Sequence, residues 1–132
     1  RRLLHPHGKL KENLFSGKPM RRVILESPYA GNIWQRWRNR RYARQCLAHS
    51  LVRGEAPIAS HLLYTQVLDD RIPLQRQMGI DAGLAWRVVT EATVVYIDRG
   101  ISLGMAHSIN KAIAAGTPVE YRRLHALDHN KR

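Results

Sequence analysis

The segment ATVVYID, residues 92–98, constrains the fold of this chain more than any other feature. Its first six residues carry no charge, and β-branched and aromatic side chains dominate it, as in a strand that is buried on both faces. A second apolar run, residues 23–25, leads into a Ser-Pro-Tyr-Ala-Gly loop. Strands of this kind belong to parallel sheets that helices cover on both sides. The chain therefore has to supply helices between its strands.

Helical patterns do lie between the apolar runs. One helix is expected from about Asn39, as its N-cap, to Gly54, with a packing stripe on one side and a basic face on the other. The packing stripe consists of Ala43, Cys46, Leu47, Ser50 and Leu51. The basic outer face consists of Arg40, Arg41, Arg44 and Gln45. Short strands are expected over residues 56–60 and 117–124. Further helices are expected over residues 62–70, broken near Pro73, and over residues 76–92 and 102–116.

Two of these helices have predicted packing residues. For the helix over 76–92 they are Ile80, Leu84, Trp86, Val88 and Val89, and for the helix over 102–116 they are Leu103, Ala106, Ile109, Ala112 and Ile113.

This order of elements predicts an α/β fold. Right-handed crossovers lead to a doubly wound, Rossmann- or flavodoxin-like parallel sheet of four or five strands with helices on both faces. We expect the strand order 2-1-3-4. Residues 20–124 would form the single domain, flanked by a flexible basic arm, residues 1–19, and a polar tail, residues 125–132.

Charge is distributed very unevenly along the chain. The formal net charge is +12, and residues 1–53 alone hold 13 Lys/Arg against two Asp/Glu. Such a block is typical of a solvated face, but it also suits nucleic acid or a phosphorylated ligand. With 44% apolar and 24% charged residues, the chain is typical of a globular protein. The single cysteine, Cys46, allows no internal disulfide, which favours the cytoplasm.

Ligands of open parallel sheets bind beyond the carboxyl ends of the strands. This rule selects four loops, which would supply hydroxyls, an imidazole, a carboxylate and the first backbone N–H groups of a helix. The residues that we expect to contact a ligand are Ser27, Pro28, Tyr29, Gly31, Asn32, Tyr64, Arg99, Gly100, Gly104, Met105 and Arg122. The candidate catalytic residues are His61, Asp98 and Ser102.

Several of these residues have a structural alternative. Ser102 suits an N-cap as well as a ligand contact, and His61 suits a hydrogen-bonded structural histidine. Tyr29 could pack its ring on the loop or stack on a ligand. Asp98 is the strongest functional candidate, because a carboxylate at the end of a central apolar strand has little structural reason to be there.

The chain resembles the nucleoside 2-deoxyribosyltransferase-like superfamily over about residues 21–124. The similar segments are ILESPYAGN and TVVYIDRGISLGMAHSINKAIAAGTPVEY. That superfamily includes 2′-deoxynucleoside 5′-phosphate N-hydrolases and small bacterial and phage domains, which the segments PIASHLLY and DRGISLGM resemble most. The resemblance implies the same α/β fold, a nucleotide or nucleoside ligand, and a homodimer whose sites borrow residues from the neighbouring subunit.

The resemblance also implies a catalytic glutamate that this chain lacks. The enzymes carry a nucleophile in a Glu-x-Gly-x-Ala pattern, and the corresponding residues here are Ser102, Leu103, Gly104, Met105 and Ala106. Retaining glycosyl transfer needs two carboxylates about 5 Å apart. Asp98 could replace the missing nucleophile, and His61 could act as the proton donor or base.

Three functions therefore stay open. The chain could be a nucleotide N-glycosidase or transferase with rearranged catalytic groups. It could be a non-catalytic protein that binds or sequesters nucleotides or ADP-ribose-like ligands. It could also bind nucleic acid through the basic arm and helix, although no recognition motif supports this. We expect no metal, no other cofactor and no membrane association.

Overall fold

The computed structural model describes residues 18–125. Most of the expected basic arm and polar tail lies outside these residues. The strands and helices follow one another as β1 (Arg21–Glu26), α2 (Ile33–Val52), β2 (Glu55–Ile58), α3 (Ser60–Leu63), η1 (Tyr64–Gln66), α4 (Pro73–Ala85), η2 (Trp86–Val89), β3 (Ala92–Tyr96), α5 (Leu103–Ala114) and β4 (Val119–Arg122). The elements η1 and η2 are short 3₁₀ helices.

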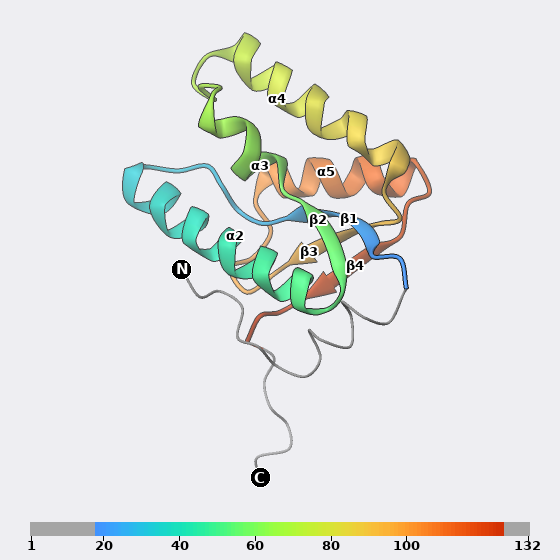
Figure 1. Ribbon diagram of the computed structural model, residues 1–132. Helices are drawn as coiled ribbons and strands as arrows, with labels where there is room; N and C mark the ends of the chain where they lie inside the picture. The colour runs from blue at the N-terminus through green and yellow to red at the C-terminus, as the bar shows by residue number, and fades with distance from the viewer. Residues whose placement is uncertain (1–17, 126–132) are drawn as a thin grey trace.

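The four strands form one sheet in the order β2-β1-β3-β4, and every neighbouring pair is parallel. Both the doubly wound fold and the expected strand order are confirmed. All five residues of β3 are buried, because helices cover this strand on both faces. Figure 1 shows α2 on one side of the sheet and α5 on the other, with α4 on the α5 side.

Alternate residues of the strands divide the core into two layers. On the α2 side, Val23 and Leu25 of β1 and Val94 and Tyr96 of β3 pack with Cys46. On the α5 side, Val95 packs with two residues of that helix, Met105 and Ile109. Cys46 is fully buried, so its predicted place in the core is confirmed.

The start of α2 differs from the prediction. The helix begins at Ile33, because the side chain of Asn32 accepts a hydrogen bond from the backbone N–H of Gln35. The Gln35 side chain in turn accepts from the backbone N–H of Asn32, which completes a capping box. Asn39 lies inside the helix, and its amide donates to the backbone carbonyl of Tyr29 at 3.2 Å. It thus holds the preceding loop instead of starting the helix.

The boundaries of β2 and α4 differ from the predicted ones by fewer residues. Strand β2 is Glu55–Ile58, and the chain is already helical at Ser60. Pro73 occupies the first turn of α4 and so begins this helix, a position at which its missing N–H costs nothing.

The predicted packing faces of α4, η2 and α5 were partly wrong. Leu103 and Ile113 are 92% and 61% exposed, because Met105, Ile109 and Ala112 face the sheet instead, at a spacing of four and three residues. Val88 is 87% exposed, and Trp86 and Val89 are also exposed, because the helix tightens into η2 after Ala85. Between residues 18 and 125, no helix is both long enough and apolar enough to cross a bilayer.

Candidate functional site

The carboxyl edge of the sheet brings the predicted loops together. Because all four strands are parallel, the loops after β1, β2 and β3 and the end of β4 leave the sheet at the same edge. The closest contact between two of them joins Ser27, directly after β1, to His61 in α3. The Ser27 Oγ and the His61 Nε2 lie 2.6 Å apart.

Burial controls the chemistry of this pair. It lowers the pKa of His61 to about 4, so the imidazole is neutral at neutral pH. Ser27 and Pro28 are buried. The Tyr29 ring, which is only partly buried, meets the His61 ring edge-on, with 6.5 Å between the ring centres. A neutral imidazole, a hydroxyl and an aromatic ring therefore converge from two loops.

The remaining predicted residues of the first two loops have structural contacts. Asn32 caps α2. Gly31 has a φ of +146°, and a Cβ there would lie 2.4 Å from the Gln35 side chain, so a larger residue would break the cap. The Tyr64 hydroxyl accepts a hydrogen bond of 2.8 Å from the Trp86 indole. The predicted roles of Gly31, Asn32 and Tyr64 in ligand binding stay predictions.

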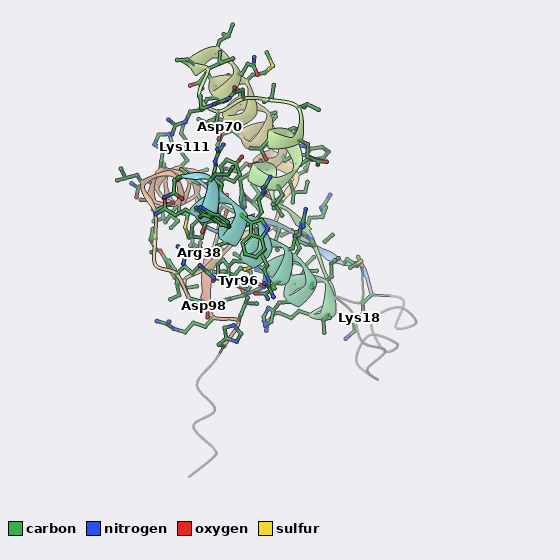
Figure 2. All side chains as sticks on the ribbon, turned by 90° about the vertical axis from the view of Figure 1, so that its left-hand side faces the viewer. Lys18, Arg38, Asp70, Tyr96, Asp98 and Lys111 are labelled. Atoms are coloured by element: carbon green, nitrogen blue, oxygen red, sulfur yellow. The ribbon has the colours of Figure 1, made fainter. Side chains whose placement is uncertain are left out.

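Asp98 joins three elements of the fold. Its carboxylate accepts hydrogen bonds from the Tyr42 hydroxyl at 2.6 Å and from the backbone N–H groups of Leu124 and His125 at 2.8 and 3.2 Å. Burial raises the pKa of Asp98, but these hydrogen bonds outweigh burial, so the pKa is below its usual value. Figure 2 shows Asp98 at the sheet end nearest the end of the described chain. The carboxylate therefore has a structural task that its place in the sequence did not reveal.

The turn before α5 has the predicted form. Gly100 has a φ of +77°, which favours glycine, and the Ser102 hydroxyl caps the helix by accepting from the backbone N–H of Met105 at 3.2 Å. The Met105 side chain is buried under this turn. A Cβ on Gly104 would have no described atom within 4 Å, so the backbone is open to approach there. Arg99 places its guanidinium over the Tyr42 ring at 5.2 Å.

Arg122 is committed to a buried ion pair. Its two terminal nitrogens donate to the two carboxylate oxygens of Glu55, each at 2.6 Å. Ser50 donates to the same carboxylate, and the Arg122 guanidinium also lies 3.5 Å from the Tyr96 hydroxyl. The hydrogen bonds to Glu55 raise the pKa of Arg122 further above its usual value. These bonds point the Arg122 side chain into the protein and not toward a ligand. A contact between Arg122 and a ligand therefore stays a prediction.

A carboxylate that the sequence analysis missed is Glu26, the last residue of β1. The Ser108 hydroxyl of α5 donates to it at 2.5 Å, and Arg87 donates to that hydroxyl at 3.1 Å and to Thr93 at 3.1 Å. Burial raises the pKa of Glu26 to about 7, although the Ser108 bond and the Arg87 charge lower it. The signal was present, because Glu26 ends an apolar strand just as Asp98 does.

Glu26 and Asp98 lie on opposite sides of the sheet. Glu26 contacts α5 through Ser108, whereas Asp98 contacts α2 through Tyr42. They therefore do not form the close carboxylate pair of a retaining glycosidase. Within residues 18–125, no hydrogen bond joins Asp98 to His61 or Ser102. No three His, Cys, Asp or Glu side chains of this part of the chain gather as a metal ion would require.

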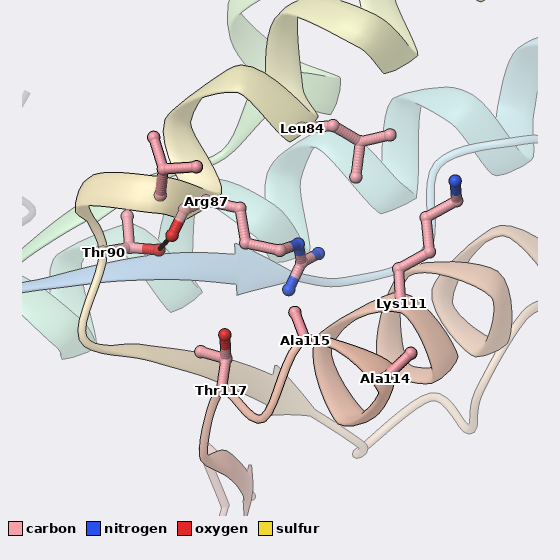
Figure 3. A pocket seen from close by; sticks show the side chains of 8 residues that line it. Leu84, Arg87, Thr90, Lys111, Ala114, Ala115 and Thr117 are labelled. Carbon is pink, nitrogen blue, oxygen red and sulfur yellow. Dashed lines mark hydrogen bonds between the residues drawn. The ribbon is translucent and has the colours of Figure 1, made fainter.

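Two hollows lie away from this edge. One of about 630 Å³ opens between η2 and α5, near the amino ends of β3 and β4 (Figure 3). Arg87 and Lys111 both line it, together with the Leu84 side chain and small residues of α5. The other, of about 360 Å³, lies on the outer face of α2. We place the candidate site at the loop edge instead, where the buried polar groups converge.

Residues 21–122 match the family described as Domain of unknown function (DUF7768). The chain belongs to this family. The matched range begins with β1 and ends with β4, so the DUF7768 domain comprises the whole parallel sheet and its helices. No curated protein and no solved structure matches the chain.

Proposed function

We propose that this protein binds a nucleotide or nucleoside at the carboxyl edge of its sheet. The observation that carries the proposal is the 2.6 Å contact between Ser27 and His61, with the Tyr29 ring beside it. Two loops converge there on a neutral imidazole and a partly exposed aromatic ring. The resemblance to nucleoside 2-deoxyribosyltransferase-like proteins supports the same ligand class.

Each part of the edge has a distinct task in this proposal. The Tyr29 ring stacks on the base. His61, held through Nε2 by Ser27, uses its other ring nitrogen, Nδ1, as a hydrogen-bonding group for the ligand. The first backbone N–H groups of α5, which have no acceptor within the helix, receive a phosphate next to the open backbone of Gly104.

Calorimetry with nucleosides and nucleoside monophosphates tests this proposal. We expect monophosphates to bind more tightly than nucleosides, and Tyr29→Ala to weaken binding about fivefold or more, as for the loss of one stacked base. Ile113→Ala is the control, because Ile113 is an exposed apolar residue near the carboxyl end of α5, away from this edge. Equal binding by wild type and Tyr29→Ala would exclude stacking on Tyr29, and equal binding of monophosphates and nucleosides would exclude a phosphate at the start of α5.

Cleavage of an N-glycosidic bond is the second candidate function, and Glu26 favours it. A carboxyl group whose pKa is about 7 can donate a proton to a leaving base near neutral pH. In this mechanism Glu26 protonates the leaving base while water attacks the anomeric carbon and forms the sugar hydroxyl. The second carboxylate that retention requires is absent from the start of α5, where Ser102 stands.

Release of free base, followed by chromatography, separates the two functions. If the protein is an enzyme, Glu26→Gln should bind nucleotide as well as wild type but lose most base release. Ser102→Glu should raise base release, because it places a carboxylate at the position that the resembling enzymes use. If ligand binds but neither wild type nor Ser102→Glu releases base, the protein is a binder that could sequester nucleotides.

We also propose a cytoplasmic homodimer. The outer surfaces of α4 and η2 support it, because Leu74, Met78 and Val88 are 74%, 55% and 87% exposed. Apolar surface of this kind is typical of subunit interfaces. Light scattering of wild type and of Val88→Asp tests this: wild type should have twice the chain mass and the variant a smaller one. A monomeric wild type would contradict the dimer.

A further inference from the structure

The outer face of α2 has a composition that the nucleotide site does not explain. This 20-residue helix contains no Asp or Glu and five arginines. Of these, Arg38, Arg40, Arg41 and Arg44 are exposed. None of the five forms an ion pair within residues 18–125. Figure 2 looks onto the side of the molecule where α2 lies and shows Arg38 on this helix. The positive charge of the face is thus not neutralised by the described fold.

Two tryptophans lie on the same face. Trp34 and Trp37 are 75% and 51% exposed, although indole rings are usually well buried. Trp34, Trp37, Arg41 and Arg44 are spaced by three, four and three residues, so they follow one line along the helix. We name these four residues the tryptophan–arginine stripe.

The surface is hollowed at the Arg44 end of the stripe. Trp37, Arg41 and Arg44 line a depression of about 360 Å³ together with Arg40, and the Arg41 guanidinium lies 5.7 Å from the Trp37 ring centre. From Trp34 to Arg44 the helix rises about 15 Å, at about 1.5 Å per residue. This length offers several cations and two aromatic surfaces to one extended ligand.

We propose that the tryptophan–arginine stripe binds single-stranded nucleic acid. Bases stack on Trp34 and Trp37, and phosphates pair with Arg41 and Arg44. Exposed aromatic rings next to cations suit single strands, because the bases of a single strand are free to stack, whereas duplex bases are already stacked. This site is separate from the proposed nucleotide site, and each can exist without the other.

Two other partners agree less well with the stripe. A second copy of the chain on this face would add four more exposed arginines and no Asp or Glu of α2 to pair with them, so the contact would gather like charge. An anionic membrane would attract the charge, but the opposite side of α2 is fixed in the core by Tyr42, Ala43 and Cys46. The helix therefore cannot turn an apolar face into lipid.

Titration of tryptophan fluorescence with a single-stranded oligonucleotide tests the proposal on the full chain. We expect quenching, and tighter binding of the single strand than of the matching duplex. With the two phosphates that pair with Arg41 and Arg44 neutralised, raising salt from 50 to 200 mM should weaken binding about sevenfold. Trp37→Ala should weaken it about fivefold or more.

Control variants separate a specific stripe from general charge. Arg44→Gln should weaken binding and reduce the salt dependence, whereas Arg76→Gln, an exposed arginine of α4, should change little. Circular dichroism establishes that each variant is folded. Tighter binding of duplex, equal loss in both arginine variants, or an unaffected Trp37→Ala would each overturn the proposal. Binding to vesicles with anionic lipid but not to the oligonucleotide would assign the stripe to a membrane instead.

Discussion

Replacement of Glu26 by glutamine should stabilise the protein above neutral pH. Burial raises the pKa of Glu26 from 4.5 to about 7, so the folded state keeps a proton that the unfolded chain releases between these values. Stability is therefore lost as pH rises through this window, because the unfolded state binds fewer protons. At about 1.4 kcal/mol per unit, the loss amounts to about 3 kcal/mol at pH 8. Glutamine keeps the shape of the side chain and avoids this loss.

His61 has the opposite effect on stability in nearly the same window. Burial lowers its pKa from 6.5 to about 4, so between these values the unfolded chain binds the extra proton, and stability rises with pH. The two groups largely compensate in the wild type from about pH 4.5 to 6.5. Glu26→Gln should therefore reveal the rising dependence that His61 causes.

Urea unfolding at pH 5, 6, 7 and 8 measures the effect. The difference in unfolding free energy between Glu26→Gln and wild type isolates Glu26, because all other groups occur in both proteins. We expect this difference to grow by about 1.4 kcal/mol per pH unit between pH 5 and 7 and then to level off. A difference that is independent of pH would refute the raised pKa.

Two further predictions concern packing and charge. Arg122→Leu should lower the free energy of unfolding in urea by about 3–5 kcal/mol, because it leaves the Glu55 carboxylate buried without its bidentate partner. The double variant Arg122→Leu with Glu55→Leu should lose much less. Losses that add up from the single variants would contradict this coupling. Gly83→Ala should cost about 1–3 kcal/mol, because its Cβ would lie 2.9 Å from the Ser60 hydroxyl, whereas Gly79→Ala meets only ordinary contacts and should be neutral or stabilising. Equal thermal stabilities of the two alanine variants would contradict the close contact.

The fold could be predicted because its signals are local. The apolar run of β3 and the helical patterns between strands determine a parallel sheet, and chain connectivity then determines its order. The start of α2 was missed because Asn32 and Gln35 cap it jointly, a pairing that requires both side chains at once. The packing face of α5 was missed in part, because Leu103 and Ile113 fit the apolar pattern but lie outside the face that Met105, Ile109 and Ala112 bury.

The site was harder to predict than the fold. The rule for parallel sheets selected the edge of the sheet at which Ser27 contacts His61. It could not assign the carboxylates, because the side of the sheet on which a side chain lies depends on strand pairing. Glu26 and Asp98 look alike in the sequence, each at the end of an apolar strand. Only the paired sheet shows that one contacts α5 and the other contacts α2.

The two carboxylates also differ in what the fold does to their charge. Asp98 is stabilised as an anion by three hydrogen-bond donors, as expected of a structural group. Glu26 is destabilised as an anion, and a loss of about 3 kcal/mol is large against a total stability of about 5–15 kcal/mol. If Glu26 served only as a counter-charge for Arg87, its replacement by glutamine would destabilise the fold at pH 8. Stabilisation combined with loss of base release would instead identify a group that is kept for function at the expense of stability.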